Sequence, residues 1–306
     1  MTDTTATALP AYDAVRERLG TVGIWSAQLR FGDPVESLEA AAELDELGFA
    51  TLWIPDAGGP VIETVERLLV QTASASVATG ILNVWMHDPA TIAREHARID
   101  DAYPGRFVMG LGVSHAPTID ADEPGRYQRP LSKMRDYLAD LAANRVEGHR
   151  PARLVAALAP KMLELARAET SGIHPYLVPV EHTRWAREQL GAEPVVAPSL
   201  SVVVETDPAV ARAIARKDVE TYLGLPNYVN TWRRLGYGDD DFAGNGTDAF
   251  IDALYAHGSV EAIAARIDAH RSAGADHVCV RVVTGRPDDA LHLPRAEWRT
   301  LAGLLS

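Results

Sequence analysis

Three side chains that can carry protons follow apolar segments of the chain. Asp56 comes directly after "TLWIP", His87 follows "ILNVWM", and His115 follows "RFVMGLGVS". Carboxylates and imidazoles are the usual groups of general acid and base catalysis, and imidazole titrates near neutral pH. Asp56 equally suits the N-cap of the next helix, and a single histidine is often a structural residue. Because two histidines at neighbouring strand ends would face one cavity, we predict that all three residues are catalytic.

The segment 110–112, "GLG", has the start of a dinucleotide-binding fingerprint. His115 occupies the position of the third glycine, so the G-x-G-x-x-G pattern fails. Glycine at a strand end also lets a flat ligand approach the backbone closely. We therefore predict that Gly110, Gly112 and Ser114 border a ligand, with a packing role for Gly110 as the alternative.

Two segments are candidates for holding the anionic part of a ligand. A predicted helix begins between Pro179 and Thr183, where His182 and Thr183 add donors to the free backbone N–H groups. An ordinary helix start capped by Thr183 is the alternative. Lys161 opens another predicted helix, where it would neutralise an anionic ligand or the protein surface. Schiff-base chemistry of an aldolase would instead require Lys161 inside the fold.

Several other kinds of chemistry lack support in the sequence. No metal-ligand spacing and no Gly-x-Ser-x-Gly elbow is present, so we predict no metal and no serine hydrolysis. The net charge of −13 disfavours nucleic-acid binding. No segment approaches the roughly 20 apolar residues of a membrane span. With a single cysteine, Cys279, and no signal-peptide pattern, we expect the cytoplasm. His96, within "REHARIDD", is predicted to lie on a solvated helix surface.

Short apolar segments alternate with predicted helices along the chain. The segments begin at Thr21, Ala50, Ser76, Arg106, Arg153, Ile173, Leu200 and Asp276. Apolar residues on both faces are typical of parallel strands covered by helices. Asp33, Asp88 and Asp207 each precede a proline, which predicts a helix start at each position. This alternation predicts an α/β (β/α)8 TIM barrel, whose chemistry lies at the carboxyl ends of the strands.

The spacing of the predicted strands also indicates the domain organisation. Longer gaps follow the fourth and seventh strands, and we predict insertions there that build the ligand site or a lid. No linker or low-complexity segment divides the chain. Residues 1–20 are therefore predicted to be an N-terminal extension, and residues 21–306 a single domain.

Several of these segments together resemble the luciferase-like monooxygenase superfamily, in the branch of oxidoreductases that use the deazaflavin coenzyme F420. The resembling segments are "ELGFATLWIPDAGG", "ATGILNVWMHDPATIAREH", "PGRFVMGLGVSHAP", "LAALAPKMLELA", "GIHPYLVPVEHTRWAREQLG" and "LGLPNYVNTWRRLGYGDDDF". The resemblance implies a (β/α)8 barrel that binds F420, or FMN as the alternative, at the strand ends. It also implies a homodimer, a small-molecule substrate and a non-prolyl cis peptide at Asn83–Val84.

The resemblance further implies where the coenzyme would lie. The residues expected near its ring are Asp56, Asn83, Val84, Gly110, Gly112 and Ser114. The residues expected near its tail are Ala159, Lys161, His174, Tyr176, His182 and Thr183. Trp25 and Trp85 are predicted to be walls of the substrate pocket, with a place in the core as the alternative.

The catalytic groups depart from those of related sugar-phosphate dehydrogenases. In those enzymes the second strand ends in Asp-His and the fourth in Gly-Glu, whereas here Ala57 follows Asp56 and His115 takes the place of the acid. We therefore expect hydride transfer to a small organic substrate, with His115 or His87 as the proton donor. An FMN-dependent monooxygenase and a non-catalytic deazaflavin-binding protein are the alternatives.

Overall fold

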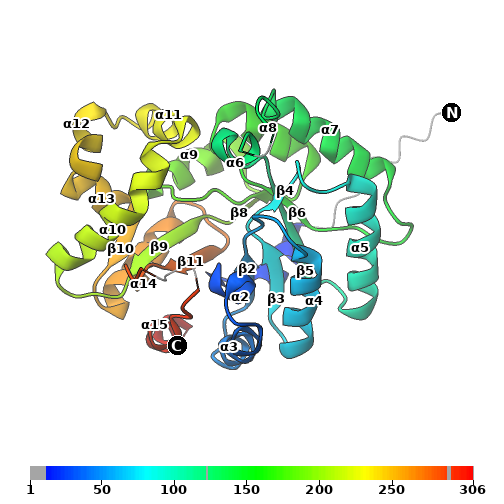
Figure 1. The fold of residues 1–306 in the computed structure, drawn as a ribbon, viewed down its shortest axis with the longest axis horizontal. Helices are drawn as coiled ribbons and strands as arrows, with labels where there is room; N and C mark the ends of the chain where they lie inside the picture. Colours follow the sequence, from blue (N-terminus) through cyan, green and yellow to red (C-terminus); the bar gives the residue numbers. More distant parts are fainter. Residues whose placement is uncertain (1–11, 122, 288–290, 306) are drawn as a thin grey trace.

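The computed structural model describes residues 12–121, 123–287 and 291–305, and it consists of parallel strands enclosed by helices (Figure 1). Every strand pairing within the described residues is parallel. The strands are β1 (Val22–Trp25), β2 (Thr51–Ile54), β3 (Ser76–Thr79), β4 (Leu82–Asn83), β5 (Phe107–Gly112), β6 (Arg153–Val155), β7 (Gly172–Ile173), β8 (Val195–Val196), β9 (Ser199–Val203), β10 (Tyr255–His257) and β11 (Val278–Val282). The predicted α/β class is thereby confirmed.

The hydrogen-bonded ladder returns to its first strand through β8 and β9. Strand β8 pairs with β7, and β9 pairs with β11, which in turn pairs with β1. Only Ala197 and Pro198 separate β8 from β9, and the N–H of Cys279 donates to the Pro198 carbonyl. Since parallel strands present their carboxyl ends on one side, the loops that follow them meet there.

Helices cover the outside of the strands. Their bounds are α1 (Tyr12–Leu19), α2 (Gln28–Phe31), α3 (Pro34–Glu46), α4 (Val61–Gln71), α5 (Pro89–Ala102), α6 (Ala116–Ile119), α7 (Pro130–Ala143), α8 (Pro160–Glu169), α9 (Val180–Leu190), α10 (Pro208–Leu223), α11 (Pro226–Arg234), α12 (Asp239–Phe242), α13 (Asp248–Leu254), α14 (Val260–Ser272) and α15 (Arg295–Leu301). The carboxylates of Asp33, Asp88 and Asp207 accept hydrogen bonds from N–H groups of the first turns, as the sequence predicts.

Two long segments follow β5 and β9. The first holds α6 and α7, and the second holds α10 to α13, β10 and α14. Helices α10 to α13 lie together at one side of the molecule in Figure 1. Strand β10, which the sequence analysis did not predict, pairs with β9 outside the ring of strands.

The predicted length of the third strand, which begins at Ser76, is wrong, because this segment divides into β3 and β4. The cis peptide lies between them, at Gly80–Ile81, and not at Asn83–Val84 as the resemblance implies. Pairing of β3 with β2 ends at Thr79, and the N–H of Asn83 donates instead to the Asp56 carboxylate. The chain therefore leaves the ladder earlier than its apolar sequence indicates.

Large rings fill the space enclosed by the strands. Trp53 of β2 stacks on His174, with ring centroids 4.1 Å apart, and its Nε1 donates to Nε2 of His277 at 3.1 Å. Val15 and Leu19 of α1 belong to the same buried cluster, so α1 covers the end of the strands opposite the predicted site. Residues 1–11 of the predicted N-terminal extension lie outside the described part of the chain.

His96 is buried, so its prediction as a solvated surface residue is wrong. Its side chain packs 5.3 Å from the Phe107 ring, on the same face of α5 as Ile92 and Ile99. Residues three and four positions apart share one face of a helix, and that face points inward here. Among the described residues, no helix is long and apolar enough to cross a bilayer.

Buried histidines predict that the protein loses stability in mild acid. Burial lowers the pKa of His96, His174, His182 and His277 to about 4, and that of His270 to about 3, from an ordinary 6.5. At a pH between the lowered pKa of about 4 and the ordinary 6.5, the unfolded chain binds more protons than the folded protein. The free energy of unfolding therefore falls as the pH drops from 6.5 toward 4.

Thermal unfolding followed by circular dichroism at pH 7.5, 6.5, 5.5 and 4.5 measures this effect. The acid limb is the fall of the unfolding midpoint as the pH drops below 6.5. We expect His96→Gln to make this fall smaller, because the substitution removes one buried titrating group. His292→Gln, at an exposed position, should leave the limb unchanged. An unfolding midpoint that does not change from pH 7.5 to 4.5 would contradict the prediction.

Candidate active site

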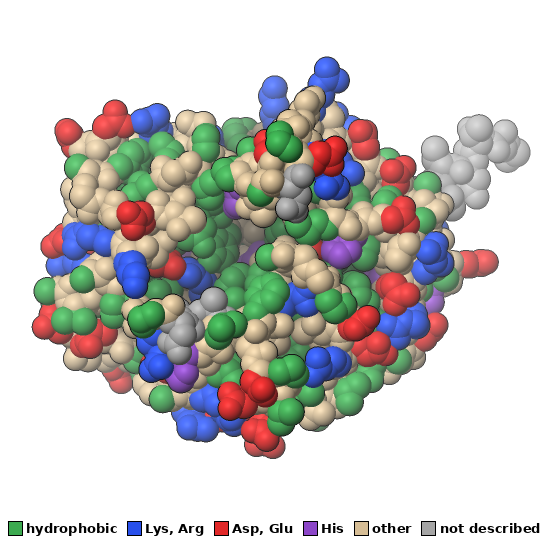
Figure 2. All heavy atoms as spheres, in the orientation of Figure 1, with side chains coloured by type: hydrophobic (Ala, Val, Ile, Leu, Met, Phe, Trp, Pro, Cys, Tyr) green, Lys and Arg blue, Asp and Glu red, His purple; other side chains and the backbone are tan. Residues whose placement is uncertain are grey.

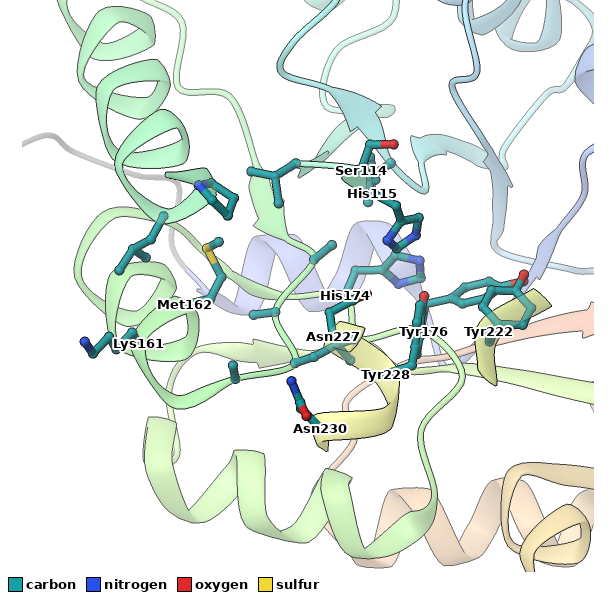
Figure 3. Close-up of a pocket in the computed structure, with 18 of the residues that line it drawn as sticks. Ser114, His115, Lys161, Met162, His174, Tyr176, Tyr222, Asn227, Tyr228 and Asn230 are labelled. Carbon is teal, nitrogen blue, oxygen red and sulfur yellow. The ribbon is translucent and has the colours of Figure 1, made fainter. Parts of the chain in front are cut away.

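A cavity of about 520 Å³ opens among the loops that follow the strands. Figure 2 shows a hollow of apolar side chains in this face of the molecule, and Figure 3 shows its lining residues. Ligand pockets typically measure about 300 to 1,000 Å³ and combine apolar walls with a few polar groups. The lining residues include Ile81, Val113, Leu131, Ala156, Ala157, Leu158 and Met162, which make it largely apolar.

The cavity brings together seven of the residues that the sequence analysis selected. They are Trp25, Ser114, His115, Ala159, Lys161, His174 and Tyr176. They lie at or after the ends of four different strands, β1, β5, β6 and β7, as expected where the carboxyl ends of parallel strands meet.

His174 contributes a polar atom without a partner to the floor of the cavity. Its Nδ1 lies 2.7 Å from the Ala197 carbonyl, which can only accept, so Nδ1 carries the proton. Nε2 is therefore a free acceptor, and it has no hydrogen-bond partner among the described residues. Burial lowers the pKa of His174 to about 4, so the ring stays neutral at physiological pH.

His115 stands at the wall of the cavity, beside helix α11. Burial lowers its pKa, and a hydrogen bond with Asn227 opposes this shift. Its Nδ1 is buried and unpaired within the described structure. The residue before it, Ser114, has a left-handed backbone with φ of 55°, which turns the chain from β5 into the loop. A neutral imidazole with an unpaired nitrogen can exchange a proton with a ligand.

Two cations lie at the end of the cavity opposite the tyrosines. Lys161 is on the first turn of α8, and Figure 3 places it away from His115 and the tyrosines. The Arg234 guanidinium at the end of α11 donates to the Leu158 carbonyl at 2.9 Å, next to Ala159. This end of the cavity therefore suits an anionic group.

Asp56 and His87 form a separate cluster that does not line the cavity. Oδ2 of Asp56 lies 2.7 Å from Nε2 of His87 and accepts from the backbone N–H of Asn83 at 3.0 Å. The Arg30 guanidinium lies 3.9 Å from the other oxygen. Burial alone would raise the pKa of Asp56, but these hydrogen bonds hold that pKa below its ordinary value. The cluster positions the segment between β3 and β4.

Gly110 and Gly112 do not contact the cavity, and their predicted role beside a flat ligand is replaced by packing. A Cβ at Gly110 would lie 1.9 Å from the Thr79 carbonyl oxygen, and one at Gly112 would lie 2.4 Å from the Ile81 side chain. The protein itself therefore occupies the space in front of both glycines. The packing alternative stated for Gly110 accounts for this strand.

His182 and Thr183 are fully buried and do not line the cavity. The Thr183 hydroxyl bonds to Nδ1 of His270 at 2.9 Å, and Nε2 of His182 lies 3.3 Å from the Leu158 carbonyl. Both side chains are therefore enclosed by the protein away from the cavity, and Thr183 does not cap α9, which begins at Val180. Lys161, the other residue predicted to face an anionic ligand, does line the cavity, as does Arg234.

Val84 and Trp85 also lie behind the lining. Val84 is fully buried, and the Trp85 Nε1 donates to the Val113 carbonyl at 2.8 Å. Trp85 contacts the ring of Tyr127, which does line the cavity, so it supports the wall and is not itself the predicted surface.

Several lining residues come from α10 and α11 and were missed. They are Tyr222, Asn227, Tyr228, Asn230 and Arg234, all within the late insertion that was predicted to build the ligand site or a lid. Trp232, on the same helix, is fully buried against Phe250. The aromatic and polar residues of "YLGLPNYVN" were the available signal, but nothing local showed which of them faces inward.

The profile of the luciferase-like monooxygenase family matches residues 20–277. The chain belongs to this family. It is 26% identical over 218 residues to the 5,10-methylenetetrahydromethanopterin reductase of Methanolobus tindarius, which covers 60% of this chain and 66% of that protein. It is 25% identical over 162 residues to a Mycobacterium tuberculosis protein provisionally named a coenzyme F420-dependent oxidoreductase, covering 53% of this chain and 45% of that one.

Solved structures share the fold. An F420-dependent secondary alcohol dehydrogenase with a bound F420–acetone adduct superposes with a TM-score of 0.71 at 14% identity, covering 93% of this chain and 97% of that one. An FMN complex of a type II Baeyer-Villiger monooxygenase from Pseudomonas putida gives 0.65 at 15% identity, covering 94% and 96%. The fold is therefore that of luciferase-like barrels, a family of oxidoreductases and monooxygenases.

The buried Asp56 cluster predicts a loss of stability on neutralisation. Asp56→Asn leaves the charge of Arg30, whose side chain is 3% exposed, without its carboxylate. We expect the free energy of unfolding to fall by about 3 kcal/mol, because breaking a buried ion pair leaves one charge unpaired. Urea unfolding measures this, with Asp136→Asn at an exposed position as the control. Equal free energies of unfolding of the two variants would show that the cluster does not stabilise the protein.

Proposed function

We propose that this chain is an F420-dependent oxidoreductase that transfers a hydride between the deazaflavin and a small organic substrate. The observation that carries the proposal is one cavity with an apolar floor, an unpaired nitrogen on His174 and two cations at one end. A flat ring with an anionic tail fits this combination. The names of one curated relative and of one of the two solved structures described above include coenzyme F420, which supports the proposal.

Residues of the cavity would hold the coenzyme in distinct ways. Lys161 and Arg234 would bind the anionic tail, because both cations lie at the same end of the cavity. His174 Nε2 would accept a hydrogen bond from the ring. Ile81, which forms the cis peptide with Gly80, would contact the apolar surface of the coenzyme ring.

The protein's own contribution to the reaction is orientation, exclusion of water and proton transfer. When bound, the deazaflavin supplies the donor or acceptor of the hydride. Val113, Leu131 and Met162 keep water from the reacting atoms. His115, which is neutral at pH 7, takes or returns the substrate proton at Nδ1. His87 has no such role here, because it is bound to Asp56 outside the cavity.

Coenzyme titration tests the proposal. We expect purified protein to bind F420, seen as a change in deazaflavin fluorescence, and not to bind FMN. Lys161→Gln and Arg234→Gln should each weaken F420 about fivefold to tenfold, because a partly exposed ion pair contributes about 1 kcal/mol. Lys217→Gln removes the same charge from the outside of α10 and should have no effect.

Each other result of the titration points to a different function. Binding of FMN without F420 would replace the proposal by an FMN-dependent monooxygenase. Binding of F420 without hydride exchange to any substrate would indicate a deazaflavin-binding protein without catalysis.

The pH profile tests the role of His115. In the direction that releases a substrate proton, we expect the rate to fall below the lowered pKa of His115, and so below pH 6.5, because protonated imidazole cannot accept. His115→Gln should abolish this limb and reduce kcat about 100-fold. His87→Gln should reduce thermal stability and retain the limb. If His87→Gln, and not His115→Gln, removes the limb, the assignment of the proton carrier is wrong.

A further inference from the structure

We infer that the aromatic end of the cavity is the substrate subsite and that it selects uncharged, apolar alcohols and ketones. This inference rests on the proposed function, which assigns the cationic end to the coenzyme tail. It names a class of substrate and the residues that select it.

A continuous row of rings forms this end of the cavity. The rings of Trp25 and Tyr176 lie 5.7 Å apart, those of Tyr176 and Tyr222 5.7 Å, and those of Tyr222 and Tyr228 5.1 Å. His115 closes the row, 5.7 Å from Tyr228. In Figure 3 the labelled members of the row gather at the side of the cavity away from Lys161. Such rings offer large apolar faces with polar atoms only at their edges.

The row is assembled from five separate parts of the chain, of which His115 after β5 is one. Trp25 ends β1, and its Nε1 donates to the Gly80 carbonyl at 2.9 Å, which fixes the ring. Tyr176 follows β7, whereas Tyr222 and Tyr228 belong to α10 and α11. The helices after β9 therefore complete this wall.

This end of the cavity carries no net charge. Behind the row, Nη1 of Arg281 donates to Oδ2 of Asp218 at 2.8 Å, and a second bond joins the other guanidinium nitrogen to Oδ1. The two opposite charges neutralise each other. Among the described residues that line the cavity, none is acidic; Lys161 lies away from the row, and Arg234 is bonded to the Leu158 carbonyl. A charged substrate would lose its hydration at the aromatic end without gaining a partner.

Two rings of the row already face a cation. The Arg281 guanidinium lies 5.8 Å from the ring centroids of both Trp25 and Tyr176. An ammonium group could not take its place there, and it would find no acidic partner among the described lining residues. The subsite therefore disfavours amines as well as carboxylates and phosphates.

The row offers polar atoms at two places, each of which suits a hydroxyl or carbonyl oxygen. The hydroxyls of Tyr176 and Tyr222 lie 3.2 Å apart, and one hydrogen suffices for the bond between them, so a second hydroxyl hydrogen remains to be donated. Burial raises the pKa of both tyrosines, which keeps them protonated. His115 Nδ1, at the other end of the row, is unpaired in the described structure. An alcohol or ketone oxygen can use either group without bringing a charge.

Binding of matched small probes tests the inference. Cyclohexanol and cyclohexanone are compared with cyclohexanecarboxylate and cyclohexylammonium, using saturation-transfer NMR on the protein with and without F420. We expect the neutral probes to bind at least tenfold more tightly than either charged probe. Equal or tighter binding of a charged probe would overturn the inference.

Two tyrosine variants locate the binding. Tyr222→Phe keeps the ring and removes the hydroxyl, and we expect it to weaken cyclohexanol about fivefold, the effect of one lost hydrogen bond. Tyr103→Phe makes the same change outside the cavity and should have no effect. Identical affinities in the two variants would also overturn the inference.

The probe and coenzyme experiments fail independently. If the neutral probes bind and Tyr222→Phe weakens them, but F420 does not bind, the proposed function is refuted and the selectivity of the subsite stands. Tight F420 binding without any preference for the neutral probes would refute the subsite and leave the proposed function.

Discussion

The stacking of Trp53 on His174 is the contact on which the site depends. Trp53 is fully buried among the strands, in the cluster that also contains Val15 and Leu19 of α1. His174, held parallel to it at 4.1 Å and bonded to the Ala197 carbonyl, has one possible orientation for its free Nε2. A Cβ at Gly80 would lie 3.1 Å from that nitrogen and 2.8 Å from Nε1 of Trp25, so glycine there avoids a close contact with both side chains.

A second buried cluster shapes the cavity without lining it. Asp56 binds His87 and the backbone of Asn83, and thereby holds the loop that begins with Gly80 and Ile81 against the strands. Trp25 bonds to the Gly80 carbonyl from the other side. The ionised groups thus act on the site through the backbone, and the cavity surface remains apolar. Among the described lining residues, Lys161 and Arg234 are the ones with a permanent charge, and Lys161 lies away from the aromatic row.

Local signals in the sequence were sufficient for the class of fold and for much of the site. Asp33, Asp88 and Asp207 cap helices through atoms two or three residues away, so a short window contains the whole interaction. Strands buried on both faces are apolar throughout, which identifies them without knowledge of their partners. Since all parallel strands end on one side, several of the residues that follow them line one cavity, including His115 and His174.

Only the tertiary structure decided which polar residues face that cavity and which are paired behind it. Asp56 and His87 meet across 31 positions, and Thr183 and His270 across 87, so no local pattern records that these side chains already have partners. The same limit applies to the aromatic row, in which Tyr222 and Tyr228 from the helices after β9 meet Trp25 from β1. Spacing along the chain determines the face of a helix or strand, whereas contacts between distant elements determine what that face meets.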